Sequence, residues 1–245
     1  MKQSIFTILE NTPLTASVYR LRLSGDTSAI TAPGQFVNIL LEGRFLRRPI
    51  SVCDCEDGCL TLLYKVVGKG TEQMSRMAVG ETLDLLTGLG NGYDRGEAGE
   101  APLLIGGGVG VPPLYMLAKQ LIARGCDVRV ILGFGTASEV FYEEEFRALG
   151  ARVTVTTVDG SYGVRGFVTA ALDEAPYTYF YTCGPEPMLR ALHAATVTSG
   201  QYSFEERMGC GFGACMGCSC KTVTGYKRIC REGPVLRKEE ILWKD

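Results

Sequence analysis

The chain has 245 residues, a formal net charge of −2 and a composition that is 46% hydrophobic and 21% charged, which predicts a globular protein of two or three domains. The slight negative charge argues against a nucleic-acid binder, and no apolar stretch approaches the roughly 20 residues of a membrane span. Ten cysteines without a signal-peptide core lead us to expect a cytoplasmic protein with redox or metal chemistry. The single histidine, His193, disfavours histidine-based zinc sites and Ser-His-Asp catalysis.

The N-terminal part, residues 1–97, consists of short strand patterns separated by turns. Period-two alternation and the turn residues between the runs are typical of a small antiparallel barrel. A glycine-rich polar stretch over 87–100 then indicates a domain boundary. Within the barrel, strands are predicted over 17–23, 35–41 and 60–67, and one short helix over 71–77.

Beyond residue 98, apolar runs of strand length alternate with helical patterns. This succession predicts a doubly wound parallel sheet with helices on both faces. Its strands are expected at 102–105, 127–132, 152–158 and 177–181, and its helices at 114–124, 140–149, 168–172 and 187–198. From about residue 201 the pattern gives way to a glycine- and cysteine-rich segment with little periodic structure. We therefore expect a β-barrel over 1–97, an α/β domain over 98–200 and a small cysteine domain over 201–245.

The C-terminal cysteines have a recognisable spacing. Cys210, Cys215 and Cys218 form a C-x4-C-x2-C motif, and Cys230 follows further along the chain. This is the ligand spacing of plant-type [2Fe–2S] ferredoxins, in which each iron takes two thiolates. Cys220 competes for the third position, but the x4/x2 spacing selects Cys218. The alternative is structural zinc, which more often uses two C-x2-C arms.

Two motifs in the barrel suit a flavin nucleotide. Arg47-Arg48-Pro49-Ile50-Ser51 supplies a guanidinium and a hydroxyl that can hold a pyrophosphate through charge-assisted hydrogen bonds. Gly68-Lys69-Gly70-Thr71 precedes the short helix, where backbone amides attract anions. A surface arginine pair and a G-x-G turn are each common. The prediction of a flavin nucleotide site therefore depends on their order, Arg-x-x-Ser followed by Gly-x-Gly-Thr. Three further cysteines nearby, Cys53, Cys55 and Cys59, match no metal template and are interpreted as barrel thiols.

The α/β part contains a second nucleotide signal. A glycine loop over 106–110 follows the first strand and opens a helix, which lets a pyrophosphate approach the backbone. It lacks the G-x-G-x-x-G fingerprint, so a different dinucleotide-binding lineage is indicated. Cys183-Gly184-Pro185 follows the last predicted strand, where ligands of such sheets bind, although Cys183 can equally be a packed core thiol. No basic residue occurs from Gly133 until Arg147, which favours NAD over NADP.

In this order, the motifs resemble the ferredoxin–NADP reductase superfamily. With the cysteine motif added, residues 3 to 235 are similar to the family of electron-transfer subunits of NAD-linked (type B) dihydroorotate dehydrogenase. The resemblance implies an oxidoreductase subunit with FAD, a [2Fe–2S] cluster and NAD, and without a catalytic acid–base residue of its own. The implied FAD residues are Arg48, Pro49, Ile50, Ser51, Leu63, Tyr64, Lys65, Gly70 and Thr71. The implied NAD residues are Gly106, Gly107, Gly108, Gly110, Cys183, Gly184 and Pro185. The implied cluster ligands are Cys210, Cys215, Cys218 and Cys230.

The same resemblance implies a partner. Dihydroorotate oxidation in pyrimidine biosynthesis would belong to an FMN-containing catalytic subunit, in a heterotetramer of two subunits of each kind. Apolar Met208, Phe212 and Met216 beside the cysteines suggest a docking surface, or they pack onto the barrel. Two alternatives stay open: a related relay subunit of an NADH-dependent ferredoxin–NADP reductase or of a cytosolic hydrogenase, and a zinc-stabilised nucleotide-binding module.

Overall fold

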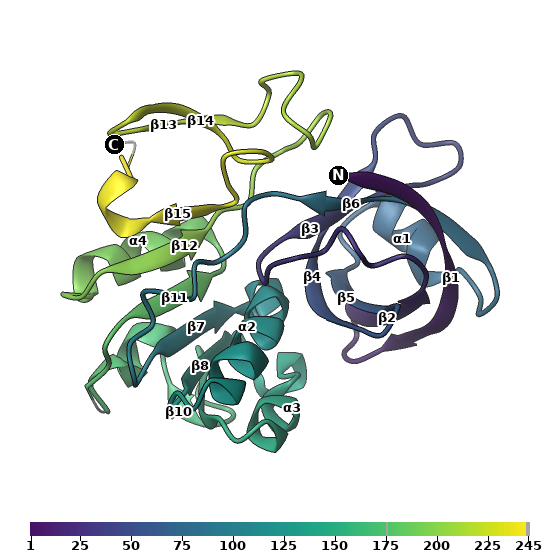
Figure 1. Cartoon of the computed structure of the whole chain (residues 1–245). Coiled ribbons are helices and arrows are strands. Elements are labelled where there is room, and N and C mark those ends of the chain that lie inside the picture. Colours follow the sequence, from purple (N-terminus) through teal and green to yellow (C-terminus); the bar gives the residue numbers. More distant parts are fainter. Residues whose placement is uncertain (175, 244–245) are drawn as a thin grey trace.

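The first third of the chain forms a closed barrel in the computed structural model, which describes residues 1–174 and 176–243. The strands are antiparallel and follow the order β1-β2-β5-β4-β3-β6 around the barrel (Figure 1). The hairpin between β4 and β5 turns at Asp57 and Gly58, which both have positive φ, as a two-residue hairpin turn requires. The elements are β1 (Lys2–Pro13), β2 (Val18–Ser24), β3 (Phe36–Leu40), β4 (Arg48–Glu56), β5 (Cys59–Lys65), α1 (Lys69–Ser75) and β6 (Thr82–Leu89).

The second part is built on a seven-stranded sheet with the order β10-β9-β8-β7-β11-β12-β15. All neighbouring strands are parallel except β12 and β15. The elements are β7 (Leu103–Gly107), α2 (Pro112–Ala123), β8 (Arg129–Phe134), α3 (Glu143–Ala148), β9 (Arg152–Thr157), β10 (Val164–Arg165), β11 (Phe180–Cys183), α4 (Glu186–Ala195), β12 (Gly200–Ser203) and β15 (Val235–Arg237). The described residues also contain four short 3₁₀ helices: η1 (Gly108–Gly110), η2 (Ala137–Glu139), η3 (Val168–Glu174) and η4 (Lys238–Glu240).

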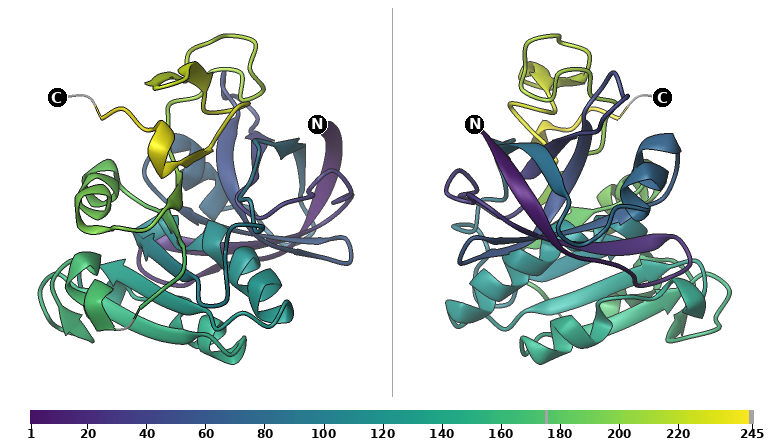
Figure 2. Two further views of the ribbon diagram at one scale, coloured as in Figure 1. Left: turned by 60° about the vertical axis from the view of Figure 1, so that its left-hand side comes forward. Right: turned by 90° about the vertical axis from the view of Figure 1, so that its right-hand side faces the viewer.

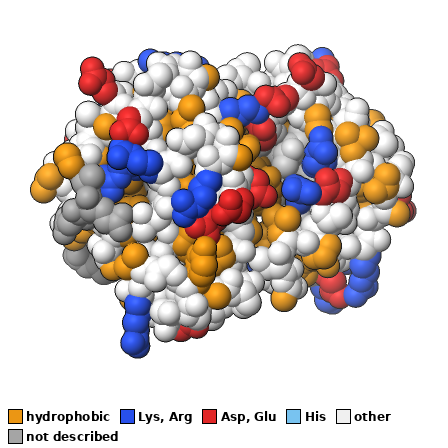
Figure 3. Space-filling view, turned by 90° about the horizontal axis from the view of Figure 1, so that it is seen from below, with side chains coloured by type: hydrophobic (Ala, Val, Ile, Leu, Met, Phe, Trp, Pro, Cys, Tyr) orange, Lys and Arg blue, Asp and Glu red, His pale blue; other side chains and the backbone are white. Residues whose placement is uncertain are grey.

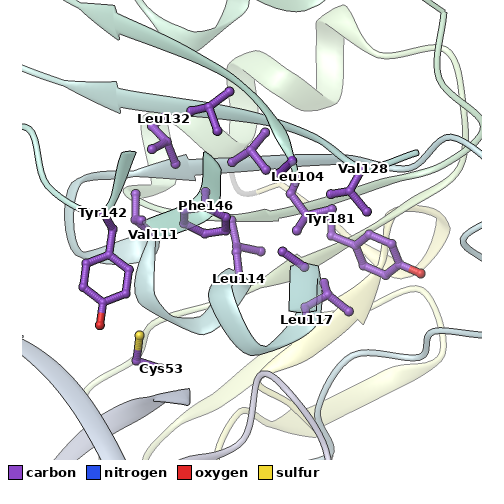
Figure 4. Packing of buried hydrophobic residues seen from close by; sticks show 14 of the residues in the cluster. Cys53, Leu104, Val111, Leu114, Leu117, Val128, Leu132, Tyr142, Phe146 and Tyr181 are labelled. Atoms are coloured by element: carbon purple, nitrogen blue, oxygen red, sulfur yellow. The ribbon is translucent and has the colours of Figure 1, made fainter. Parts of the chain in front are cut away.

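Both faces of this sheet are covered, as predicted. Leu104 of β7 packs in the core that contains α2 and α3 (Figure 4). Its neighbours Leu103 and Ile105 point the other way, into the core that contains η3 and α4. None of the helices in the described ranges is both long and apolar enough to cross a membrane.

The C-terminal region is more regular than expected. β12 and β15 extend the sheet, and β13 (Ser219–Thr222) and β14 (Gly225–Arg228) form a separate hairpin. β12 escaped prediction because its polar Gln201 and Ser203 are buried, and Gln201 hydrogen-bonds the backbone of Asp94. The strand expected at 177–181 lies at 180–183, and the helix expected at 168–172 is 3₁₀. The domain limits 1–97, 98–200 and 201–245 remain an interpretation of the sequence.

The barrel and the sheet domain share a buried contact. Helix α2 packs on β4, where Lys119 forms a 2.9 Å ion pair with Asp54. Cys53 of β4 is fully buried, and its thiol faces Tyr142 across this contact (Figure 4). Burial raises the pKa of Cys53 far above its ordinary value, so this thiol is a packing group. Figure 2 shows the cysteine segment at one end of the molecule, above both parts.

Candidate functional site

A cavity of about 350 Å³ opens beside β4 and β5 of the barrel. Eight of the residues predicted for FAD line it: Arg48, Pro49, Ile50, Ser51, Leu63, Tyr64, Lys65 and Thr71. The ninth, Gly70, lies against Arg48, and a Cβ there would collide with the guanidinium. The sequence motifs therefore converge on one cavity, with Gly70 leaving room for the arginine.

The two neighbouring arginines have different surroundings. Arg47 is bound within the barrel, since its Nη1 donates to a carboxylate oxygen of Asp84 at 2.9 Å and to the backbone oxygen of Asn38 at 3.2 Å. Arg48 lines the cavity and hydrogen-bonds only the backbone oxygens of Leu46 and Arg47 among the described residues. Its charge is thus available to a ligand. A guanidinium and hydroxyls beside aliphatic and aromatic walls fit a flavin nucleotide, which has an apolar ring and an anionic pyrophosphate.

The sequence did not predict the rest of this cavity's lining. It comes from β3, the chain just after β5, the glycine loop, the chain from β12 onward and the residue before β15: Phe36, Val67, Val109, Ser203, Phe204, Glu205, Glu206, Met208 and Pro234. Glu205 faces the cavity, and the surrounding protein raises the pKa of its carboxyl. No local motif assigns these residues to the flavin cavity, and the fold brings Val109, Met208 and the segment around β12 to the barrel from distant parts of the chain.

A second cavity, of about 470 Å³, lies at the carboxyl ends of β7, β8, β9 and β11. Strand order reverses between β7 and β11, and ligands of open α/β sheets bind at such a reversal. Three residues predicted for NAD line this cavity: Gly107, Gly108 and Pro185.

The other predicted NAD residues support the cavity from beneath. Gly110 packs against the backbone of Cys183 and Gly184, where a Cβ would collide with the Cys183 carbonyl. A Cβ on Gly106 would lie 2.9 Å from the Cα atom of Val111. Cys183 is 2% exposed, and burial raises the pKa of its thiol. The two motifs therefore meet, but Cys183 itself is a buried thiol beneath the cavity.

The nucleotide cavity also contains residues that the sequence analysis did not assign. They are Gly133, Phe134, Gly135, Glu139, Thr156, Val158, Gly166, Phe167, Val168, Thr169, Pro187, Met188 and Ala191. Most are apolar or glycine, and they lie at or just after the ends of β8 and β9, in the segment from β10 into η3, and in α4. The sequence signal for some of them is a position within or just after the predicted strands 127–132 and 152–158.

The four predicted cluster cysteines form two pairs. The Cys210 thiol interacts with that of Cys215, and its Sγ accepts the backbone N–H of Ala214 at 3.2 Å. Cys218 pairs with Cys230, whose backbone N–H donates to the Cys218 Sγ at 3.4 Å. Burial acts to raise the pKa of Cys210, but hydrogen bonds, led by the Cys215 amide, outweigh it and lower the pKa to about 6. Burial and the neighbouring Cys218 raise the pKa of Cys230 to about 12.

This arrangement fits a binuclear iron cluster. Two thiolates for each of two irons is what a [2Fe–2S] centre needs, and the amides that donate to sulfur stabilise thiolate charge. Within the described residues, no group of three histidine, cysteine or acidic side chains is arranged to hold a single metal ion. Cys220 lies on β13, where it lines a separate cavity of about 80 Å³ with Trp243.

The three sites adjoin one another. Phe36 lines the flavin cavity and packs in one buried core with Cys218 and Cys230. Val109 lines the flavin cavity, and its chain neighbour Gly108 lines the nucleotide cavity. The cysteine pairs, the flavin cavity and the nucleotide cavity therefore lie in that order.

Comparison with known proteins agrees with this arrangement. Residues 205–242 match the iron–sulfur cluster binding domain of dihydroorotate dehydrogenase B, and residues 104–194 match an oxidoreductase NAD-binding domain. The electron transfer subunit of dihydroorotate dehydrogenase B (NAD(+)) from Geobacillus sp. (strain WCH70) is 43% identical over 99% of both chains. The chain belongs to this family. The Fusobacterium nucleatum subunit of the same name is 41% identical over 98% of this chain and 99% of its own.

Solved structures give the same fold. The NADH-dependent reduced ferredoxin–NADP oxidoreductase, a protein of flavin-based electron bifurcation, superposes with a TM-score of 0.87 at 30% identity, covering 97% of this chain and 90% of its own. The Amycolatopsis cytochrome P450 reductase, at 24% identity and a TM-score of 0.70 over 79% of this chain and 65% of its own, shares the fold.

These findings confirm the cofactor set of FAD, [2Fe–2S] and NAD and the role of an electron relay in an oxidoreductase. They set aside the zinc module. The ferredoxin-linked relay is less favoured, since identity to that structure is 30% against 41–45% to the dihydroorotate dehydrogenase subunits. The family name, electron transfer subunit, implies a catalytic partner.

Proposed function

We propose that this chain carries electrons from the FMN of a dihydroorotate dehydrogenase catalytic subunit, through its [2Fe–2S] cluster and FAD, to NAD+. The observation that carries this proposal is the row of three adjoining sites, linked by Phe36 on one side and Val109 on the other. A flavin supplies the exchange between the two-electron hydride of a nicotinamide and the single electrons of a cluster.

Each site has residues suited to its ligand. Cys210, Cys215, Cys218 and Cys230 would hold the cluster. The guanidinium of Arg48 would hold the flavin pyrophosphate, with Ser51 and Thr71 as further hydrogen-bonding groups and Pro49, Ile50, Leu63, Tyr64, Lys65 and Gly70 forming the rest of the wall. The glycine loop and Pro185 would let the nicotinamide dinucleotide approach the backbone. In this proposal the protein positions these groups and excludes water, and no side chain of the chain serves as acid or base for dihydroorotate.

The partner would dock at the cluster end. Phe212 is 42% exposed and Met216 is 54% exposed, both in the cysteine loop, whereas Met208 packs inward and lines the flavin cavity. Phe45, in the loop between β3 and β4, is 98% exposed, and this loop stands at the same end as the cysteine loop (Figures 1 and 2). Exposed apolar rings around a redox centre are typical of a protein interface.

The opposite face has a different character. Seen from below, it intersperses Lys and Arg with Asp and Glu, with apolar side chains between them (Figure 3). We assign docking to the cluster end because a relay needs its outlet near the cluster. We further infer a cytoplasmic heterotetramer with two copies of each subunit, in which a reducing environment keeps the cysteines available as ligands.

Co-expression with the FMN-containing subunit of the same genome tests the proposal. We expect one stable complex on a sizing column that reduces NAD+ with dihydroorotate, whereas the isolated chain oxidises NADH only with artificial acceptors. Phe212→Asp should weaken the complex without loss of iron or FAD. Val197→Asp, at a position that is 96% exposed on the sheet domain, is the matched control.

Two results would contradict the proposal. One is the absence of a complex under conditions where both subunits carry their cofactors. The other is dihydroorotate-dependent NAD+ reduction that continues after the cluster has been removed. Either would favour a relay with a different partner, such as a ferredoxin-linked enzyme.

A further inference from the structure

The nucleotide cavity has two distinguishable ends. Gly108 lies beside Val109 of the flavin cavity, so the nicotinamide of a bound dinucleotide belongs at the β7 and β11 end. The remaining length of the ligand must extend across the carboxyl ends of β8 and β9, where Val158 and Phe167 line the cavity. This second end therefore receives the adenosine ribose, if the proposed nucleotide site is correct.

One carboxylate lines the cavity at that end. Glu139 closes the short helix η2 (Ala137–Glu139) directly after β8, and it is the one charged residue among the described residues that line the cavity. Its Oε2 accepts the backbone N–H of Gly135 at 2.8 Å. Its other oxygen, Oε1, has no hydrogen-bond partner among the described residues.

The loop that carries Glu139 is held in place by further contacts. The Ala137 N–H donates to the Ser161 hydroxyl at 2.8 Å, and that hydroxyl donates to Asp159 at 2.6 Å. Gly135 admits the carboxylate because a Cβ there would lie 2.6 Å from Oε2. The carboxylate is thus fixed with one oxygen free at the mouth of the cavity.

We infer that Glu139 determines the nucleotide preference of this chain, by accepting a hydrogen bond from a free ribose 2′-hydroxyl and repelling a 2′-phosphate. A carboxylate and a phosphate dianion at contact distance repel each other, whereas a hydroxyl can donate to the carboxylate. An acidic residue that binds the ribose in NAD sites, replaced by a basic one in NADP sites, is the general form of this selection.

The basic residues nearest in sequence do not offset this charge. Arg147 is paired with Glu143 at 2.7 Å and with Glu144 at 3.8 Å. Arg165 of β10 packs its aliphatic stem along Gly160 and does not line the cavity. A 2′-phosphate would therefore meet a carboxylate without a compensating cation.

The binding of two dinucleotide fragments can be measured without electron transfer, so it reports on this end of the cavity alone. ADP-ribose and its 2′-phosphorylated form are titrated into the full chain by calorimetry, with wild type, Glu139→Gln and Glu139→Lys. We expect wild type to prefer ADP-ribose and Glu139→Gln to reduce that preference about tenfold, the effect of removing one charge near a phosphate. Glu139→Lys should favour the 2′-phosphorylated fragment. Glu144→Gln, with a side chain that is 85% exposed on α3, is the matched control.

Three outcomes would overturn the inference. The first is an unchanged preference in Glu139→Gln. The second is an equal loss of affinity for both fragments in that variant, which would mean that Glu139 only supports the Gly135 backbone. The third is a change of preference in Arg165→Ala instead. These titrations do not test electron transfer. If dihydroorotate-linked activity is absent but the fragments bind as expected, the inference about Glu139 still holds. If neither fragment binds, the nucleotide site is misplaced and the inference fails with it.

Discussion

The cysteine loop and the nucleotide cavity, at the two ends of the row of sites, are constructed in opposite ways. The loop over 208–217 bends tightly, with positive φ at Gly211, Gly213 and Met216, and it directs backbone N–H groups at the Cys210 sulfur. The cavity is lined by glycines and apolar side chains with one carboxylate. The loop presents strong ligands in close pairs, whereas the cavity offers shape and backbone.

This difference corresponds to how long each ligand stays bound. Thiolate bonds to iron make a permanent site, while an apolar pocket with few polar groups suits a ligand that must leave after each turnover. The flavin cavity lies between the two in position and in character, since it combines aliphatic walls with the charge of Arg48. The expected cost of a substitution should therefore decline from the cluster, through the flavin cavity, to the nucleotide cavity.

The largest effect is expected at the cluster. Replacing Cys210, Cys215, Cys218 or Cys230 with serine should abolish the EPR signal of the reduced cluster, because each iron needs two thiolates. FAD should remain bound, since the flavin cavity has its own walls. Cys220→Ser is the matched control and should keep the signal. Loss of the cluster in Cys220→Ser together with its retention in Cys218→Ser would reverse the ligand assignment.

Next comes the flavin cavity, where the two arginines give a paired test. Arg48→Ala removes a charge-assisted contact to the pyrophosphate, which typically costs about 1.5 to 3 kcal/mol, or roughly ten- to hundredfold in FAD affinity. Arg47→Ala should weaken FAD much less, because its guanidinium is already bonded to Asp84. Fluorescence titration of FAD into the apoprotein measures both. Tight stoichiometric FAD in Arg48→Ala after dialysis would refute the placement.

A smaller effect is expected at the nucleotide cavity. Gly110→Ala would push a methyl group into the backbone of Cys183, and such overpacking costs about 1 to 3 kcal/mol. If this cost falls on NADH binding, the Kd for NADH rises roughly fivefold to hundredfold. Iron and FAD content should be unchanged. Gly68→Ala, at a position with open space around it, is the control. Equal NADH affinity in both variants would show that the glycine loop does not shape this site.

The parts that could be predicted from the sequence are those whose residues are close together in the chain. The cysteine spacing and the Arg48 to Ser51 motif each bring several groups into one short segment, so their chemistry is visible without a fold. Strand alternation predicted the barrel for the same reason: in β5, Leu60 and Leu62 are buried while Thr61 between them is not.

What could not be predicted depends on contacts between distant segments. Phe36 and Ser203 reach the same flavin cavity from strands of different sheets. β12 and β15 join the nucleotide sheet although their sequences are short and partly polar, because hydrogen bonds such as those of Gln201 compensate for burial. Glu139 lies in the segment whose lack of basic residues favours NAD, but only the cavity shows that its carboxylate lies where the dinucleotide would bind.

The smallest effect concerns the support behind Arg48. Asp84 of β6 binds Arg47 of the flavin motif at 2.9 Å, and both side chains are about four-fifths buried, with 20% and 18% exposed. Burial acts to raise the pKa of Asp84, but hydrogen bonds from Arg47 and Gln3 and the Arg47 charge outweigh it and lower the pKa. A carboxyl with a lowered pKa in the folded state stabilises the fold at pH values above its unfolded pKa of about 3.9, and this contribution is lost as pH falls through the folded value.

Asp84→Asn should therefore lower the free energy of unfolding by about 1 kcal/mol at pH 7, a fall of about 2 to 4 °C in Tm for a chain of this size. The difference from wild type should shrink only below about pH 4, first because the carboxyl of the unfolded chain gains a proton and then, at lower pH, because the folded carboxyl does. Thermal unfolding followed by circular dichroism from pH 7 to pH 3.5 measures both features. Asp127→Asn is the control, since its partner Arg152 and Asp127 itself are 61% and 60% exposed and exposed pairs contribute little. If the Tm difference for Asp84→Asn is the same at pH 3.5 as at pH 7, the ion pair is not its cause, and Arg47 loses its role as the fixed neighbour of the flavin arginine.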